Sequence, residues 1–207
     1  MYRFLLLCIS FLLLQGCIKQ KSSDDNLIKK EYGYKILDND STYVEIDLKK
    51  YPTYLKLHNK IQELSCNDST PNISFKTKNI LKTIYFNEFC YSSGMTYCPN
   101  LKNIIEITKD SVFKVGDIFP IDSLFYVMKK DYSNYGKDPS YSDSPERIGI
   151  AIQYEATDST DNLIELFDRI TRTADSIKLK TPLYIMLWEK IEILPPPPPP
   201  IGYSETN

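Results

Sequence analysis

Residues that enzymes commonly use for acid–base chemistry and for phosphate binding are scarce in this chain. Its 207 residues include one histidine, His58, and 7 glycines. The sequence has no Gly-rich phosphate loop, no Gly-x-Ser-x-Gly nucleophile motif and no His-Glu-x-x-His metal motif, the patterns by which these chemistries are most readily recognised. A pair of carboxylates that meets only in the folded chain stays open, because such a pair leaves no motif. We expect a protein that is not an enzyme and that binds no cofactor or metal.

Positive charge is not in excess either. The chain has 25 Lys and Arg residues against 27 Asp and Glu residues, for a formal net charge of −2 at pH 7. Binding to nucleic acid depends on clustered positive charge that neutralises phosphates. The composition therefore excludes nucleic acid as an expected partner.

Long apolar runs are lacking, apart from a short one at the N-terminus. Residues 4–14 are apolar except for Cys8 and Ser10, and Arg3 precedes them. A helix that crosses a bilayer needs about 20 apolar residues, so this shorter run is typical of a secretory signal peptide. We expect residues 1–16 to be absent from the mature protein.

The predicted cleavage site has a recognisable form. Residues Leu14-Gln15-Gly16-Cys17 resemble the lipobox of bacterial lipoproteins. The resemblance implies that Cys17 is acylated, becomes the new N-terminus and holds the chain to a membrane outside the cytoplasm. A plain signal peptide followed by a chance cysteine is the alternative. Residues 17–31 are polar and follow no helix or strand period, which favours a flexible spacer between the anchor and the domain.

The segments that flank the domain leave two questions open. Ser23-Asp24-Asp25 resembles the acidic export signals of some surface-exposed outer-membrane lipoproteins, whereas an ordinary linker would leave the domain facing the periplasm. Residues 191–207 form a tail in which Pro195 to Pro200 must adopt a polyproline II helix of about 19 Å. That tail is either a ligand for an aromatic groove or a solvated terminus.

Cysteine usage agrees with an oxidising compartment. Besides Cys17 and a cysteine in the signal peptide, the chain has Cys66, Cys90 and Cys98. Cys90 and Cys98 bracket a turn-rich segment, so the sequence predicts a disulfide between them that leaves Cys66 unpaired. A zinc site built from His58 and these thiols is disfavoured, because closely spaced cysteine pairs are lacking.

Residues 32–103 are predicted to form a strand-strand-helix-strand region that ends in the cysteine loop. The first two strand-like segments flank the turn Asp38-Asn39-Asp40-Ser41, which indicates a hairpin. Pro52 opens a helical pattern in which apolar residues and His58 share one face. We therefore place His58 in or beside the core. The expected strands are residues 32–37, 42–48 and 80–86.

Residues 104–190 give a clearer pattern, which predicts an α+β domain with a mixed sheet and helices on one face. The strand at 148–154 alternates bulky and small side chains, so we expect it to be central, with a helix packed over its small side. The helix that follows has the best amphipathic pattern in the sequence. Its apolar stripe is Leu163, Leu166, Phe167, Ile170, Ala174 and Ile177. The expected order, strand-strand-helix-strand-helix-strand, has its elements at 104–108, 111–115, 122–131, 148–154, 162–177 and 183–187.

This order resembles the periplasmic domain of the ExbD/TolR biopolymer-transport family. The resemblance rests on the strand 148–155, the polar step Ala156-Thr157-Asp158, the helix 162–177 and the closing strand at Tyr184-Ile185-Met186. That family works through a transmembrane helix with a proton-carrying acidic residue, and the apolar run 4–14 has no Asp or Glu. The resemblance therefore implies the fold without the motor role.

Three functions follow as hypotheses. The leading one is a non-enzymatic binding or adaptor lipoprotein of the cell envelope with a protein partner, for which a clustered, exposed apolar patch is the feature to find. The second is an inhibitor or immunity-type lipoprotein. The third is a surface glycan-binding protein or hydrolase, whose cleft would use several of the 16 tyrosines and two facing carboxylates. The oligomeric state stays open.

Overall fold

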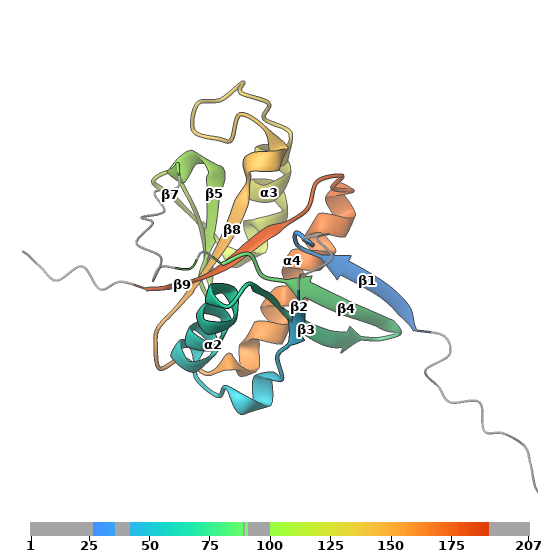
Figure 1. Ribbon diagram of the computed structural model, residues 1–207. Helices are drawn as coiled ribbons and strands as arrows, with labels where there is room; N and C mark the ends of the chain where they lie inside the picture. The colour runs from blue at the N-terminus through green and yellow to red at the C-terminus, as the bar shows by residue number, and fades with distance from the viewer. Residues whose placement is uncertain (1–26, 36–41, 89, 91–99, 191–207) are drawn as a thin grey trace, which may run out of the picture.

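The computed structural model describes residues 27–35, 42–88, 90 and 100–190 (Figure 1). Within these residues the chain forms three α-helices and two mixed sheets, which confirms the α+β class. The predicted signal peptide, Cys17, Cys98 and the proline-rich tail lie outside the described residues.

A four-stranded sheet is built from the first part of the chain, in the order β1-β4-β3-β2. Strands β3 and β4 form an antiparallel hairpin, and the two outer strands run parallel to their neighbours. The strands are β1 (Ile28–Tyr32), β2 (Thr42–Glu45), β3 (Ser69–Thr77) and β4 (Ile80–Tyr85).

Two predictions for this region are wrong. The expected hairpin of residues 32–37 and 42–48 does not form, because β1 and β2 lie at opposite edges of the sheet. The expected spacer also ends earlier than residue 31, since β1 begins at Ile28 and pairs residue by residue with β4. Both differences have one cause: each outer strand pairs its backbone with the β3–β4 hairpin, which is distant in the sequence, and not with the other outer strand.

The five-stranded sheet has the order β7-β6-β5-β8-β9. The predicted hairpin of β5 and β6 is confirmed, and the turn between them is closed by a 2.9 Å bond from the Thr108 nitrogen to the Ser111 carbonyl. Strand β8 lies inside the sheet, parallel to β5 and β9, whereas β7 was not predicted. The strands are β5 (Ile104–Ile107), β6 (Ser111–Lys114), β7 (Asp117–Pro120), β8 (Gly149–Tyr154) and β9 (Tyr184–Glu189).

The predicted helices are present. They are α2 (Tyr54–Cys66), α3 (Leu124–Tyr132) and α4 (Leu163–Ile177). Short 3-10 helices lie at Leu48–Lys50, Leu101–Asn103, Ile121–Ser123, Pro145–Arg147 and Thr160–Asn162. The α2 helix is tied to the second sheet by Tyr54, whose hydroxyl donates to the Ile152 carbonyl and lies 3.0 Å from the Trp188 carbonyl.

The α4 helix lies where the two sheets meet (Figure 1). The ring of Phe167 is fully buried and packs on Phe75 of β3 and on Phe86, which follows β4, at centroid distances of 6.3 and 5.7 Å. The predicted apolar stripe of α4 belongs to the same buried cluster as Ile150 and Ile152 of the five-stranded sheet. One hydrophobic core therefore runs through residues 32–187, across the boundary predicted at residue 103.

A buried ion pair fixes α4 against the four-stranded sheet. The Lys82 ammonium, on a side chain that is 2% exposed, lies 2.8 Å from Asp168 and 2.9 Å from the Thr171 hydroxyl. Burial raises the pKa of Asp168, but hydrogen bonds from Lys82 and Thr77 and the nearby positive charges outweigh it, so the net shift is downward. Asp168 therefore stays ionised, and its negative charge balances the positive charge of the buried Lys82.

Truncating the central ring tests this arrangement. Phe167→Ala should lower the free energy of unfolding by about 3–5 kcal/mol, as other deletions of buried Phe side chains do. Arg172 lies on the same helix with its side chain 65% exposed and pairs with Asp168 at 2.9 Å; exposed pairs at this helical spacing contribute little, so Arg172→Ala should cost only about 0.5 kcal/mol. Urea unfolding of the purified chain measures both. Equal effects of the two substitutions would mean that α4 is not packed between the sheets.

Candidate functional site

The five-stranded sheet has one face that is covered by α3 and α4 and one that is not. Residues Ile150 and Ile152 of β8 point into the helix-covered core, whereas Ala151 belongs to a separate small cluster with Ile104 and Met186. We call the second side of the sheet the open face, because no helix in the described part of the chain contributes a buried side chain to it. Its residues are Ile104, Glu106, Phe113, Ile118, Gly149, Ala151, Gln153, Tyr184, Met186 and Trp188.

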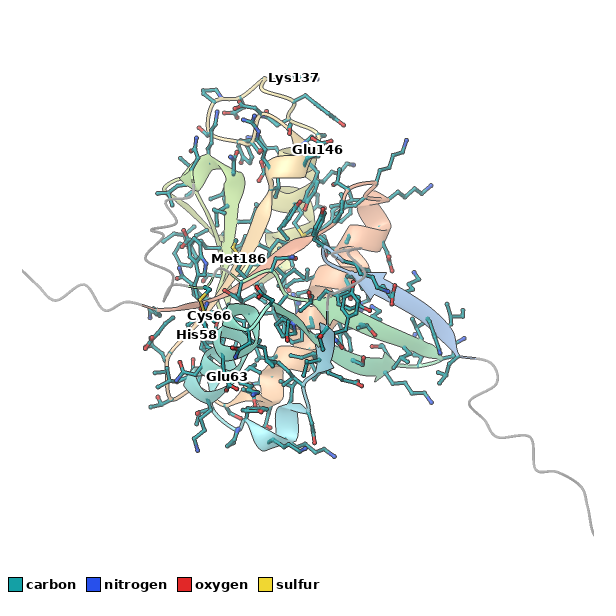
Figure 2. The ribbon with its side chains drawn as sticks, viewed as in Figure 1. His58, Glu63, Cys66, Lys137, Glu146 and Met186 are labelled. Atoms are coloured by element: carbon teal, nitrogen blue, oxygen red, sulfur yellow. A yellow bond between two sulfur atoms is a disulfide. The ribbon has the colours of Figure 1, made fainter. Side chains whose placement is uncertain are left out.

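The prediction for this strand was therefore half right. Strand β8 is interior, but the helices cover its bulky side and not its small side. The small residues serve a different purpose, since a Cβ on Gly149 would lie 2.9 Å from the Met186 methyl carbon and 3.1 Å from Ile104 Cδ1. The side chains from β5 and β9 thus lean across β8 and fill the space that its small residues leave. Figure 2 shows Met186 on β9, turned away from α4.

The exposed part of the open face lies toward its β7 edge. Ile118 stands in one cross-strand row with Phe113, Glu106, Ala151 and Met186. Its side chain is 67% exposed. Val115 and Leu101 lie at the same end of the sheet and are 47% and 59% exposed. We call Leu101, Val115 and Ile118 the edge patch. These three exposed apolar residues lie around the ends of β5, β6 and β7, and an exposed apolar patch is the feature by which the adaptor hypothesis is judged.

A buried ion pair holds the backbone under the edge patch. Lys114 precedes Val115 and pairs with Asp131 of α3, and both side chains are almost completely buried. Burial lowers the pKa of Lys114 and raises that of Asp131, and the attraction between the two opposes both shifts. Lys114 also donates to the Lys102 carbonyl at 2.6 Å. The pair thus fixes the start of β5 and the end of β6, next to Leu101 and Val115 of the patch.

The same carboxylate anchors the long loop, residues 133–148, that connects α3 to β8. The second oxygen of Asp131 accepts a 2.8 Å bond from the Ser142 nitrogen, and the Asn134 amide donates to the Ser142 carbonyl at 2.8 Å. Lys137 and Glu146 mark this loop in Figure 2, at the end of the molecule away from His58. Its interior residues are buried, so the loop is a structured extension of the domain.

The cysteine pairing differs from the prediction. Cys66, at the end of α2, is joined to Cys90, with their Cα atoms 4.8 Å apart. The predicted bond between Cys90 and Cys98 is therefore wrong, and Cys98 lies outside the described residues. Two of the three thiols that a zinc site would have needed, those of Cys66 and Cys90, are used in this bond. The pairing follows from the fold, because α2 brings Cys66 beside the segment that leaves β4.

That segment closes the outer edge of β9. The Asn87 nitrogen donates to the Ile185 carbonyl at 3.2 Å, and the Leu187 nitrogen donates to the Glu88 carboxylate. Gln62 of α2 donates to the same carboxylate at 3.2 Å. Burial raises the pKa of Glu88 to about 8, although these two hydrogen bonds lower it. Glu88 is a structural acid that links α2 to β9.

The single histidine lies beside the core, as predicted. His58 is half-buried on α2, with its ring stacked on Tyr54 at 6.5 Å, and burial lowers its pKa. Among the described residues, its buried Nδ1 atom has no hydrogen-bond partner. A general base in a catalytic triad needs a nucleophile on one ring nitrogen and an orienting group on the other. The described surroundings of His58 supply no orienting group at Nδ1.

The comparisons give no relative from which a role could be transferred. No protein-family model, no curated protein and no solved structure matches this chain. Among the helices of the described residues, none is both long and apolar enough to span a bilayer. The open face and its edge patch therefore have to be interpreted from their own geometry.

Glu88 gives a pH dependence of stability that can be measured. Its folded pKa lies above the ordinary value of 4.5, so the folded state holds the proton more tightly than the unfolded state. The free energy of unfolding should therefore fall as the pH rises from 4.5 to about 8. Glu88→Gln keeps a neutral side chain and should flatten this fall. Glu63→Gln, at an exposed position on α2, is the control and should leave the slope unchanged. An unchanged slope in Glu88→Gln would contradict the assignment.

Proposed function

We propose that the chain is a membrane-anchored lipoprotein of the cell envelope that acts as a non-enzymatic binding or adaptor protein. The edge patch carries the proposal. Three large apolar side chains exposed at one end of a sheet cost free energy in water, and a protein partner that covers them recovers it. The buried pair of Lys114 and Asp131 holds this end of the sheet in place before binding, which lowers the entropic cost of association.

The location outside the cytoplasm has two independent supports. The N-terminal sequence resembles a signal peptide with a lipobox that ends at Cys17. The disulfide of Cys66 and Cys90 is the form that cysteines take in secreted and periplasmic proteins. We also propose an outer-membrane location, with the domain on either the periplasmic or the outer face of that membrane. The likeness to the ExbD/TolR family stays a proposal that rests on element order and pattern.

Substitution of the proposed lipid attachment site tests the anchor. Cys17→Ala should leave an uncleaved or soluble precursor and abolish labelling by a palmitate analogue, because no thiol is left to acylate. Cys8→Ala, inside the predicted signal peptide, should mature and fractionate as the unmodified chain does. If Cys17→Ala stays with the membranes after a salt wash and matures to the same size, the lipoprotein assignment fails.

Crosslinking in intact cells tests the binding role. A photoreactive residue at Val115 should capture a discrete envelope protein, whereas the same residue at Ile28, which is 51% exposed on the other sheet, should not. Adding Ile118→Asp should reduce the capture by about tenfold or more, because it places a charge in the contact. Capture of the same protein from both positions, or capture that Ile118→Asp leaves unchanged, would remove the patch as the binding surface.

A further inference from the structure

A concave surface lies between the four-stranded sheet and the start of α4, lined by residues that are not part of the open face. This cleft has a volume of about 570 Å³. It is lined by Glu45, Ile46, Asp47, Leu48, Lys49, Pro52, Ile73, Ser74, Thr160, Asp161 and Ile164. The contacts that pack α4 on β3 also fix the position of this cleft at the edge of the core.

The cleft combines an apolar floor with an acidic rim. Ile46 and Ile73 are 5% and 1% exposed, and Ile164 packs against the same hydrophobic cluster. The carboxylates of Glu45 and Asp161 stand on the rim, and neither takes part in an ion pair with another described residue. This differs from the buried Asp131 and Asp168, which are paired. Asp47 and Lys49 also line the cleft, so its four charged residues carry a net charge of −2, which attracts positive charge from outside the chain.

The edge of the sheet adds a backbone element to this site. Strand β2 is an outer strand, with β3 as its neighbour in the four-stranded sheet. Residues 45–47, at the end of β2 and just after it, line the cleft. Extended peptides commonly bind by lying along an outer strand and placing alternate side chains in adjoining pockets.

We propose that this cleft binds an extended peptide segment in which a lysine or arginine stands beside aliphatic residues. The aliphatic side chains occupy the floor at Ile46 and Ile73. The cationic group reaches the rim, where charge-assisted hydrogen bonds to Glu45 and Asp161 hold it. The site is separate from the edge patch, so its existence does not depend on the proposed adaptor function.

Calorimetric titration of the full chain in a nonionic detergent, with defined probes, tests the proposal. The acetylated and amidated pentapeptide Val-Val-Lys-Val-Val should bind about tenfold more tightly than the same peptide with glutamine at its centre. Glu45→Gln and Asp161→Asn should each weaken the lysine peptide by about three- to tenfold and leave the glutamine peptide unaffected. Asp117→Asn, which removes an exposed carboxylate from β7, is the matched control and should change neither.

A benzophenone attached to the lysine peptide locates the bound segment. Crosslinks that map to residues 45–49 and 160–164 support the cleft, and crosslinks elsewhere overturn it. Equal binding of the lysine and glutamine peptides, or unchanged binding in both carboxylate variants, would also overturn it. Spermidine is the last probe: if it binds as tightly as the lysine peptide, the site recognises free cations and the peptide assignment is wrong. Both carboxylates are exposed, so the variants should keep the thermal unfolding midpoint of the unmodified chain.

Discussion

The structure depends on α4 being buried on two sides. An amphipathic helix on a sheet usually keeps a wide polar face in water, but α4 packs Phe167 on the four-stranded sheet and shares one buried cluster with Ile150 and Ile152 of the five-stranded sheet. The polar residues beside these contacts therefore lose most of their contact with water: Thr171 is buried and the Asp168 side chain is 14% exposed. Asp168 and Thr171 are tolerated there because Lys82 donates to both, and Arg172 pairs with the second oxygen of Asp168. Removing one member of such a pair leaves an uncompensated charge, which costs about 3–5 kcal/mol.

This placement also explains why one sheet face stays open. The four-stranded and the five-stranded sheet share α4, and α3 joins it on the same side of the five-stranded sheet. Since α2 is tied to β9 through Tyr54 and to the segment after β4 through the Cys66–Cys90 disulfide, the described chain has no helix left for the second face. The small residues of β8 and the crossing side chain of Met186 reduce the apolar area there. The edge patch lies away from these residues, so its apolar side chains stay exposed.

Local sequence patterns were enough to predict some elements, whereas elements that depend on pairing between distant segments were missed. The stripe of α4 and the hairpin of β5 and β6 depend on residues close in sequence, and both were predicted. Strand β3 was missed because Pro71 and Asn72 argue against an interior strand, yet the ladder accommodates Pro71 by using its carbonyl to accept from the Phe86 nitrogen at 3.0 Å. Cys66 was missed as the disulfide partner of Cys90 because Cys98 lies closer to Cys90 in the sequence. The adaptor hypothesis specified the kind of surface, but its residues come from three separate segments around the ends of β5, β6 and β7.

The two proposed surfaces are expected to bind in different ways, because their outer strands differ. An exposed apolar outer strand invites unwanted pairing with other strands, and proline or charge at the edge suppresses it. Strand β7 has only four residues, begins with Asp117 and ends with Pro120. Backbone pairing there is limited, so a partner of the edge patch has to bind through side chains such as Ile118. Strand β2 contains no proline, and the acidic rim beside it selects cationic segments. At β2, the acidic residues therefore limit which peptide strands could pair with it. At β7, the short strand and its proline limit backbone pairing.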